Sequence, residues 1–381
     1  MARLGDICTI VSGSTPKSNV AEYWDGGIKW ITPAELNEET YIINDSVRHI
    51  TEVGVTKTGL KPFPQGTVIL SSRAPIGKTA IAGCEMYCNQ GFKNLICSDK
   101  INTRYLYWFL TCNTEYLNSL GRGATFKEIS KEIVANIEIP LPAMAQQIAV
   151  AEKFEKISEL IALRKEQLAK LDELVKSRFI ELFGDPVSNP HGYPKVPLSE
   201  LAEIKIGPFG SLLHKEDYIA NGHALVNPSH IVAGKISVDD ELTVSNEKFN
   251  ELSAYHLQVG DVVMGRRGEM GRCAVVQTGG LLCGTGSLLI RTKGDVTADY
   301  LQKIISFPSF KKTIEDMAVG QTMPNLNVPI VSSFHIIKPP IEIQKAYYTF
   351  VEQTDKSKLA IQQSLEKLET LKKALMQKYF G

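Results

Sequence analysis

The chain has 381 residues, of which 43% are hydrophobic and 22% charged, and its 42 basic and 42 acidic side chains cancel. This composition is typical of a globular protein with two or three domains and excludes a disordered or collagen-like chain. Seven scattered cysteines argue against a disulfide framework and favour a reducing cytosol. We see no signal peptide and no apolar run of about 18 residues, so we expect a cytoplasmic protein without a membrane partner. Zero net charge gives no bulk argument for binding nucleic acid.

The first 142 residues have the pattern of a mixed α/β domain. Short β-rich runs, such as 67–70, alternate with turns rich in Gly, Pro and Asn. We therefore expect irregular loops between short strands and assign residues 1–142 to a first domain.

Residues 143–184 predict a long helix. No Gly or Pro occurs between Pro142 and Gly184, and these two residues are typical boundaries of a helix. At 1.5 Å per residue the helix would be roughly 60 Å long and would extend beyond a single domain. Its apolar residues recur at three- and four-residue steps, which favours a coiled coil over an ordinary amphipathic helix on a globular domain. The expected interface positions are Ile157, Ile161, Leu168, Leu171, Val175 and Leu182.

The second half of the chain follows the same plan. Residues 185–340 predict another mixed α/β domain, and residues 341–381 predict another long helix, again free of Gly and Pro up to Phe380. The expected interface positions in this helix are Ile361, Leu368, Leu371 and Leu375. We expect the two helices to pack against each other as an antiparallel coiled coil.

The two halves are an internal repeat at an offset of about 194 to 198 residues. Both halves end in Phe-Gly, and Pro142 and Gln146 match Pro340 and Gln344. Residues matching without a gap are Gly66, Val68, Arg73, Gly77 and Ala80 with Gly260, Val262, Arg267, Gly271 and Ala274. The predicted fold class is therefore α+β, with two mixed α/β domains, two long helices and a pseudo-two-fold repeat.

No motif in the chain predicts catalysis, a cofactor or a metal. Gly77-Lys78-Thr79 resembles the end of a phosphate-binding loop, but Ser72 stands where that loop needs Gly. Asn227-Pro228-Ser229-His230 lacks the second Pro and the aromatic residue of a base-flipping methyltransferase motif. Cys84 and Cys88 have the spacing of metal ligands, but no second Cys/His pair of metal-finger type follows.

The plan of domain, helix, domain, helix resembles the specificity subunit of type I restriction–modification systems. Local strings agree, because Gly13-Ser14-Thr15-Pro16 and the segment 23–31 are similar to the start of many target-recognition domains. Ile139-Pro140-Leu141-Pro142 is similar to the segment that enters the helix in that family. The opening of the second copy, 207–211, is less typical.

The resemblance implies a non-catalytic DNA reader in a host defence system. Each domain would read one half of an asymmetric, bipartite site in double-stranded DNA, while the helices set the spacing. Two modification (methyltransferase) subunits would dock on the helices, and restriction motor-nuclease subunits would join them. S-adenosylmethionine, ATP and Mg²⁺ would bind only to those partner subunits. Two alternatives stay open: a coiled-coil scaffold or adaptor that binds only protein, and an enzyme with a divergent site.

The duplication predicts which residues contact DNA. Two domains that read different sequences should share residues that contact phosphate and differ where bases are read. Arg73 with Arg267, and Lys78 with Arg272, are cationic in both copies, so we expect them to contact phosphate or to brace a loop. Arg266 and Glu269 lack charged counterparts, as expected for contacts to guanine and cytosine.

Further candidates lie in two loops at matching positions, 121–127 and 320–325. Glycine residues there would let the backbone approach DNA closely, although ordinary surface turns are the alternative interpretation. The candidates in these loops are Arg122, Thr125, Lys127, Gln321, Thr322 and Asn325. Weaker candidates elsewhere are Lys17, Tyr23, Trp30, His214 and Lys215, of which Trp30 is expected in the core.

Overall fold

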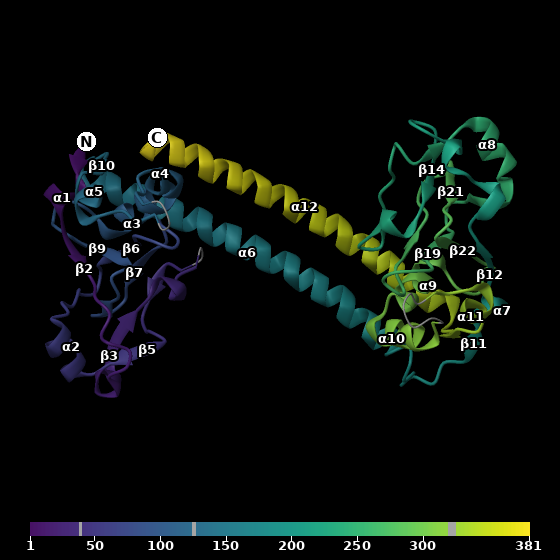
Figure 1. Ribbon diagram of the computed structural model, residues 1–381, viewed down its shortest axis with the longest axis horizontal. Helices are drawn as coiled ribbons and strands as arrows, with labels where there is room; N and C mark the ends of the chain where they lie inside the picture. Colours follow the sequence, from purple (N-terminus) through teal and green to yellow (C-terminus); the bar gives the residue numbers. More distant parts are fainter. Residues whose placement is uncertain (38–39, 124–126, 319–324) are drawn as a thin grey trace. The chain divides into compact units, whose positions relative to one another are not determined.

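The computed structural model describes residues 1–37, 40–123, 127–318 and 325–381. The chain divides into two compact units (Figure 1). Unit 1 comprises Met1–Gln167 and Ile361–Gly381, and unit 2 comprises Leu168–Ala360. Each unit contains one α/β domain and a part of each of two long helices, α6 (Met144–Phe183) and α12 (Ile341–Phe380).

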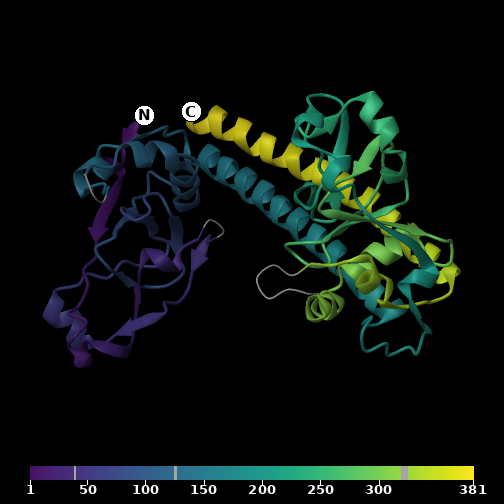
Figure 2. The ribbon, with the colours of Figure 1, turned by 45° about the vertical axis from the view of Figure 1, so that its right-hand side comes forward.

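The two long helices are antiparallel within each unit and lie side by side in Figures 1 and 2. In unit 1 the start of α6 meets the end of α12, where the ring of Phe154 stacks on Phe380 with centroids 5.5 Å apart. In unit 2 the end of α6 meets the start of α12, where the Tyr347 hydroxyl lies 3.3 Å from the Val175 carbonyl oxygen. The predicted antiparallel pair is confirmed.

Most of the predicted interface positions on these helices are shielded from solvent. Ile157 and Ile161 are buried, and Leu168, Leu171, Val175, Leu182, Ile361, Leu368 and Leu375 are half-buried. The prediction for Leu371 is wrong, because this side chain is 47% exposed. The neighbouring Lys372 is half-buried instead, with its Nζ 5.1 Å from the ring centroid of Trp108. At this turn α12 contacts the domain of unit 1 as well as α6, which changes the position that becomes buried.

The domain of unit 1 contains a sheet with strand order β2-β9-β6-β7-β4 and a smaller sheet with order β5-β3-β8. A further pair joins β1 to β10. The strands are β1 (Ala2–Arg3), β2 (Cys8–Ser12), β3 (Trp24–Ile31), β4 (Ile42–Ile43), β5 (Arg48–Ile50), β6 (Val68–Ser71), β7 (Thr79–Ala82), β8 (Tyr87–Cys88), β9 (Phe92–Cys97) and β10 (Glu138–Ile139). The helices are α1 (Leu4–Ile7), α2 (Glu52–Thr58), α3 (Thr103–Cys112), α4 (Thr114–Ser119) and α5 (Lys131–Ala135).

The domain of unit 2 repeats the core of this topology, with sheets of four and five strands in place of five and three. Its sheets have the orders β12-β22-β19-β20 and β13-β17-β14-β21-β18, and β11 pairs with β23 and β15 with β16. The first strands are β11 (Lys195–Pro197), β12 (Ala202–Ile206), β13 (Tyr218–Ile219), β14 (His223–Val226), β15 (Ile231–Val232), β16 (Lys235–Ile236) and β17 (Thr243–Val244). The others are β18 (His256–Leu257), β19 (Val262–Gly265), β20 (Cys273–Val275), β21 (Leu281–Cys283), β22 (Ser287–Thr292) and β23 (His335–Ile337). The helices are α7 (Leu198–Leu201), α8 (Asn246–Glu251), α9 (Ala298–Ile305), α10 (Pro308–Met317) and α11 (Val328–Ser332).

The registers of the strands confirm the repeat. Val68 of β6 pairs with Leu95 of β9, and Val262 of β19 pairs with Ile290 of β22. The parallel pairing of β3 with β8 recurs as the parallel pairing of β14 with β21. The same strands therefore pair in the same directions in both copies.

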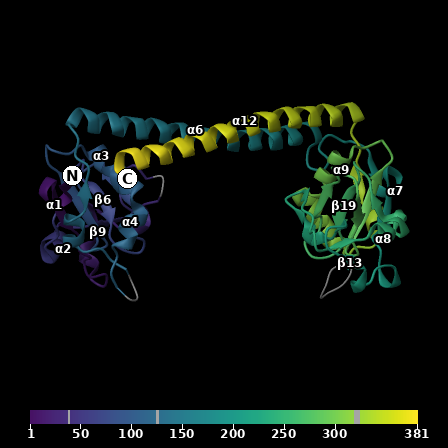
Figure 3. The ribbon, with the colours of Figure 1, turned by 90° about the horizontal axis from the view of Figure 1, so that it is seen from above.

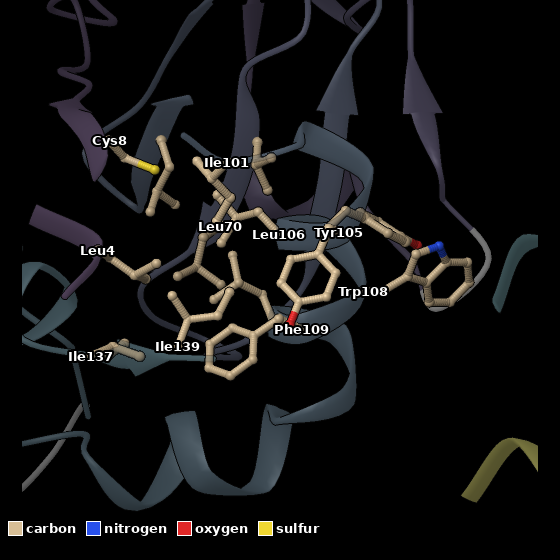
Figure 4. Close-up of a cluster of buried hydrophobic side chains, with 14 of the residues drawn as sticks. Leu4, Cys8, Leu70, Ile101, Tyr105, Leu106, Trp108, Phe109, Ile137 and Ile139 are labelled. Atoms are coloured by element: carbon tan, nitrogen blue, oxygen red, sulfur yellow. The ribbon is translucent and has the colours of Figure 1, made fainter. Parts of the chain in front are cut away.

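A helix lies between the sheet and the long helices in each unit, α3 in unit 1 and α9 in unit 2 (Figure 3). Residues Tyr105 to Leu110 of α3 are buried on all sides, because one side of the helix faces the sheet and the other faces α6 and α12. Figure 4 shows part of this core, in which side chains of α3 meet Leu4, Leu70 and Ile139. The long helices are thus fixed to the domains through apolar packing.

Both long helices end with a phenylalanine inside a domain core. The ring of Phe380, at the end of α12, lies 5.2 Å from that of Tyr105 in unit 1. The ring of Phe183, at the end of α6, lies 5.0 Å from that of Tyr300 in unit 2. Gly184 follows with φ +69°, a backbone conformation that favours glycine at the end of a helix. The repeated Phe-Gly is therefore a docking element.

A buried glutamine fixes the start of each long helix. In unit 1 the Gln147 side chain accepts from the Asn102 amide at 2.8 Å. Its Nε2 donates to the carbonyl oxygens of Pro142 at 2.9 Å and Lys100 at 3.1 Å. Two of these hydrogen bonds join α6 to the segment that precedes α3, and the third joins it to Pro142, just before its own start.

Gln344 makes the corresponding bonds in unit 2. It accepts from the Thr297 amide at 2.9 Å and donates to the Pro339 carbonyl at 2.9 Å. The equivalent of Gln344 is therefore Gln147, and the sequence match to Gln146 is wrong by one residue. Gln146 is exposed. Because Gln146 and Gln147 are adjacent and identical, the sequence alone does not indicate which of them matches Gln344.

Candidate nucleic-acid interface

Three loops of the unit 1 domain meet through backbone hydrogen bonds. They are residues 72–78 after β6, residues 89–91 before β9, and the described residues 122–123 and 127–129. The Ser72 amide donates to the Gly91 carbonyl at 2.7 Å, and the Ile129 amide donates to the Ser72 carbonyl at 3.0 Å. We call these segments the unit 1 loop junction.

The unit 2 domain forms the same junction from residues 266–272, 284–286 and 325–326. The Arg266 amide donates to the Gly286 carbonyl at 2.9 Å, and the Leu326 amide donates to the Arg266 carbonyl at 3.0 Å. We call these segments the unit 2 loop junction. The two junctions share a backbone frame in which side chains at matching positions differ.

The shared cation of each junction braces it against a turn. In unit 1 the Lys78 Nζ donates to the Pro33 carbonyl at 3.1 Å. In unit 2 the Arg272 Nη1 donates to the Pro228 carbonyl at 3.2 Å. These hydrogen bonds fit bracing, one of the two roles expected for this pair. Gly77 and Gly271 precede these cations with φ +97° and +71°, respectively. Both positions therefore favour glycine, which has no Cβ to clash in this conformation.

The remaining charges of the two junctions are arranged differently. In unit 1 the buried Lys93 lies 3.1 Å from a carboxylate oxygen of Glu128 and 3.2 Å from the Ser72 hydroxyl. In unit 2 the Arg266 Nε donates to the Leu326 carbonyl at 3.0 Å. Burial and the neighbouring Arg267 lower the pKa of the Arg266 guanidinium. The two junctions therefore carry different chemistry, as expected of domains that read different sequences.

Glu269 is held by two cations of unit 2. One carboxylate oxygen lies 2.7 Å from the Lys311 Nζ, and the other lies 2.9 Å from the Arg272 Nη2. Hydrogen bonds from Lys311 and Arg272 lower the pKa of this carboxyl, so it stays ionised. The carboxylate thereby ties the loop 266–272 to α10.

The other sequence candidates are mostly accessible. Arg122, Lys127 and Arg267 are exposed at the junctions, and Lys17, His214 and Lys215 are exposed on nearby loops. Arg73 is half-buried and forms a backbone bridge with Glu128, and Arg267 forms the corresponding bridge with Asn325. Tyr23 is half-buried, and Trp30 is 2% exposed and belongs to the core. Thr125, Gln321 and Thr322 lie outside the described residues.

A cavity of about 600 Å³ lies beside the unit 2 loop junction. It is lined by β15, β16, α9, Lys311 of α10 and the loop that carries Glu269. Its basic side chains are Lys235, Arg272, Lys303 and Lys311, against the one carboxylate of Glu269. Burial lowers the pKa of Lys303, as does the nearby charge of Lys358. The chain therefore concentrates positive charge here although its net charge is zero.

Sequence reasoning missed several residues at the junctions. Lys93 and Lys311 belong to β9 and α10 in the sequence, and nothing in their local pattern indicates contact with a loop. Phe209 is 61% exposed in the segment that follows β12, and Thr15 takes the matching place in unit 1, where its hydroxyl donates to Gln90. An exposed aromatic residue beside Pro and Gly was the only available signal.

No described helix is both long and apolar enough to cross a lipid bilayer. No group of three or more possible metal ligands occurs among the described residues.

Residues 1–173 and 190–372 match the family model described as the type I restriction modification DNA specificity domain. The chain belongs to this family. It is 29% identical over 402 residues to the type I restriction enzyme MjaIX specificity subunit of Methanocaldococcus jannaschii, covering 99% of this chain and 91% of the relative.

Solved structures of specificity subunits have the same fold. The S subunit of a type I restriction-modification system from M. genitalium matches with a TM-score of 0.56 and 15% identity, over 100% of this chain and 95% of that one. A chain from a structural study of complex assembly in the type I R-M system matches with a TM-score of 0.65 and 18% identity, over 100% and 96%. The duplicated domains and paired helices of this chain are therefore the architecture of the specificity-subunit family.

Proposed function

We propose that this chain is the DNA-specificity subunit of a type I restriction–modification complex. Each α/β domain reads one half of a bipartite site in double-stranded DNA. The helices α6 and α12 set the spacing between the half-sites and dock two modification (methyltransferase) subunits, which restriction motor-nuclease subunits join. S-adenosylmethionine, ATP and Mg²⁺ bind on those partners, and the chain itself is non-catalytic.

The observation that carries this proposal is the pair of loop junctions. Both copies keep the backbone frame and the brace from Lys78 or Arg272, while the side chains around the frame differ. This is the pattern expected when one scaffold is used to read two sequences, because contacts that position the scaffold are common to both and contacts to bases are not. A scaffold that bound only protein would have no use for two differently substituted junctions on one frame.

The charge distribution agrees with a DNA partner. Exposed cations, namely Arg122, Lys127 and Arg267, lie at the junctions, and the cavity beside the unit 2 junction is lined by four basic side chains and one carboxylate. Phosphates of the DNA backbone would be attracted to the exposed Arg122, Lys127 and Arg267, since binding of clustered cations releases counterions from DNA. Bases would then be read by side chains that differ between the copies.

Methylome mapping tests the proposal. Cells carrying this chain with its modification subunits should show methylation at one bipartite sequence. Exchanging residues 1–142 for the first domain of another family member should change one half of that sequence and leave the other half and the spacer unchanged. A change in both halves would show that the domains do not read independently. Absence of any sequence-specific methylation would overturn the proposal as a whole.

A further inference from the structure

We propose that Phe209 reads DNA through an apolar contact with the C5-methyl group of a thymine in the half-site bound by unit 2. This inference rests on the proposed function and assigns a base contact to one residue. Phe209 is 61% exposed. Single exposed apolar side chains are common on protein surfaces, so exposure alone does not indicate a function. The location of Phe209 is the evidence for its role.

Phe209 lies one loop away from the arginines of the unit 2 loop junction. The Gly207 amide donates to the Ser287 carbonyl at 3.0 Å, and a Cβ on Gly207 would lie 2.0 Å from the Gly284 carbonyl oxygen. The segment before Phe209 is therefore packed backbone to backbone against residues 284–287. In that loop the Gly286 carbonyl accepts a hydrogen bond from the Arg266 amide.

The turn after Phe209 is set by glycine. Phe209 has an extended backbone with φ −147° and ψ 165°, and Gly210 follows with φ +64°, a conformation that L side chains rarely adopt. Leu212, two residues further on, is 38% exposed. The chain thus presents two apolar side chains in a loop that borders a basic junction.

In the first copy the matching glycine also packs closely against backbone, with different chemistry beside it. The Ser14 amide donates to the Cys88 carbonyl at 3.0 Å, and a Cβ on Gly13 would lie 2.0 Å from that oxygen. The position that matches Phe209 is Thr15, whose hydroxyl donates to the Gln90 side chain. The backbone is placed alike at this position in both copies, but the side chain is a polar threonine in one and an aromatic ring in the other. We therefore expect the position to contact a base that differs between the two half-sites.

The chemistry of DNA selects the partner of this ring. Phosphate and sugar groups are polar, so an exposed phenyl ring gains little from them. In the major groove the thymine methyl is the apolar group by which a base pair is recognised, and phenylalanine is one of the side chains that contact it. Insertion of the ring between stacked bases is the competing mode, which kinks the duplex from the minor groove.

The test uses the complex of the full chain with its modification subunits and the duplex identified by methylome mapping. Each thymine of the unit 2 half-site is replaced in turn by deoxyuridine, which removes only the methyl group. We expect one replacement to weaken binding about fourfold, the effect of one methyl-sized apolar contact. Phe209→Ala should weaken binding to the unmodified duplex by at least as much and should no longer respond to that replacement.

Two variants serve as controls. Val259→Ala removes an equally exposed apolar side chain of unit 2, at 66% exposure, and should bind both duplexes as the unchanged chain does. Thr15→Ala should alter binding only through the unit 1 half-site. Because Phe209 is exposed, its replacement should leave the melting temperature unchanged, which separates a lost contact from a lost fold.

Three results would overturn the inference while leaving the proposed function intact. One is a Phe209→Ala complex with unchanged affinity and an unchanged response to deoxyuridine. Another is a unit 2 half-site that contains no thymine on either strand. The third combines two observations. Fluorescence of 2-aminopurine placed in the duplex rises with the unchanged chain but not with Phe209→Ala, and deoxyuridine has no effect on binding. Together these would identify insertion of the ring between bases. Failure of the unchanged complex to bind any sequence specifically would overturn both.

Discussion

Arg272 and Pro228 are 44 residues apart in the sequence, yet the Arg272 guanidinium donates to the Pro228 carbonyl oxygen at 3.2 Å. The corresponding pair in unit 1, Lys78 and Pro33, has a separation of 3.1 Å between the same kinds of atom. A cation that is present in both copies of a DNA-binding module would ordinarily be assigned to phosphate. Here it holds together the loops that position the other side chains.

We therefore expect bracing and phosphate contact to be separable by mutation. Lys78→Met should lower the free energy of unfolding by about 1 kcal/mol, because one hydrogen bond to a carbonyl is lost. Arg272→Met should lower it by more, because its hydrogen bonds to Glu269 are lost as well. They should leave the salt dependence of DNA binding unchanged. Arg267→Ala should behave in the opposite way, with unchanged stability and a salt slope reduced by about one ion. Thermal unfolding and binding titrations at several salt concentrations measure both quantities, and a reduced slope for Arg272→Met would assign it to phosphate.

The buried glutamines should be among the most sensitive polar residues of the chain. Gln147→Ala removes three hydrogen bonds, and Gln344→Ala also removes three, the third being its bond to the Asp295 carbonyl at 3.4 Å. Both variants leave buried backbone groups without partners, so we expect a loss of about 3 kcal/mol in the free energy of unfolding. Gln146→Ala is a matched control, since this neighbouring side chain is exposed, and should cost less than about 0.5 kcal/mol. Denaturant unfolding measures all three, and similar losses for Gln146 and Gln147 would contradict the assigned equivalence.

Substitution of the phenylalanine at the end of either long helix should destabilise only the unit in which that residue is buried. Phe380→Ala should destabilise the core of unit 1 by about 3–5 kcal/mol, and Phe183→Ala should do the same in unit 2, because each leaves a cavity. Hydrogen exchange should increase in α3 for the first variant and in α9 for the second. Leu371→Ala, at an exposed position of α12, should change neither. Equal increases in both helices from either variant would show that the two units unfold as one.

Thiol reactivity should follow burial. Burial raises the pKa of Cys273 and of Cys283 to about 12, so only about one thiol in ten thousand is ionised at pH 8. Because the thiolate is the reactive form, both residues should resist alkylation at pH 8, and their rates should rise about tenfold per pH unit up to that pKa while the fold persists. The half-buried Cys84 should react faster than either of them. Peptide mass spectrometry after iodoacetamide treatment reads out each site, and full alkylation of Cys273 in the folded chain would contradict this.

The sequence was sufficient for the architecture and for most of the helix interface. A long segment without Gly and Pro has few conformations other than a helix, and a regular apolar period identifies its buried side. The failure at Leu371 has a physical reason, because a period describes packing against one partner. Near Trp108 the helix α12 contacts a domain as well as α6, and a lysine with its charge above an indole ring occupies the sheltered position.

The candidate site could be predicted only in part. Charge and duplication indicated Arg73, Lys78, Arg267 and Arg272, but the role of each depends on contacts between loops that are distant in the sequence. The buried Lys93 could not be identified, since its partner Glu128 is 35 residues away. Spatial neighbours of this kind depend on the register of the strands, and the local pattern of the sequence does not predict that register.

The docking of Phe380 in unit 1 has a consequence for biosynthesis. The strands of the first domain are translated early, but the residue that completes its core leaves the ribosome roughly 240 residues after position 142. At 5–20 residues per second this is a delay of roughly 10 to 50 seconds. During this interval the nascent first domain exposes the apolar site that Phe380 later fills, while the second domain already has Phe183 from the helix that precedes it. A ribosome that stalls within α12 would therefore release a chain whose older domain is the unfinished one.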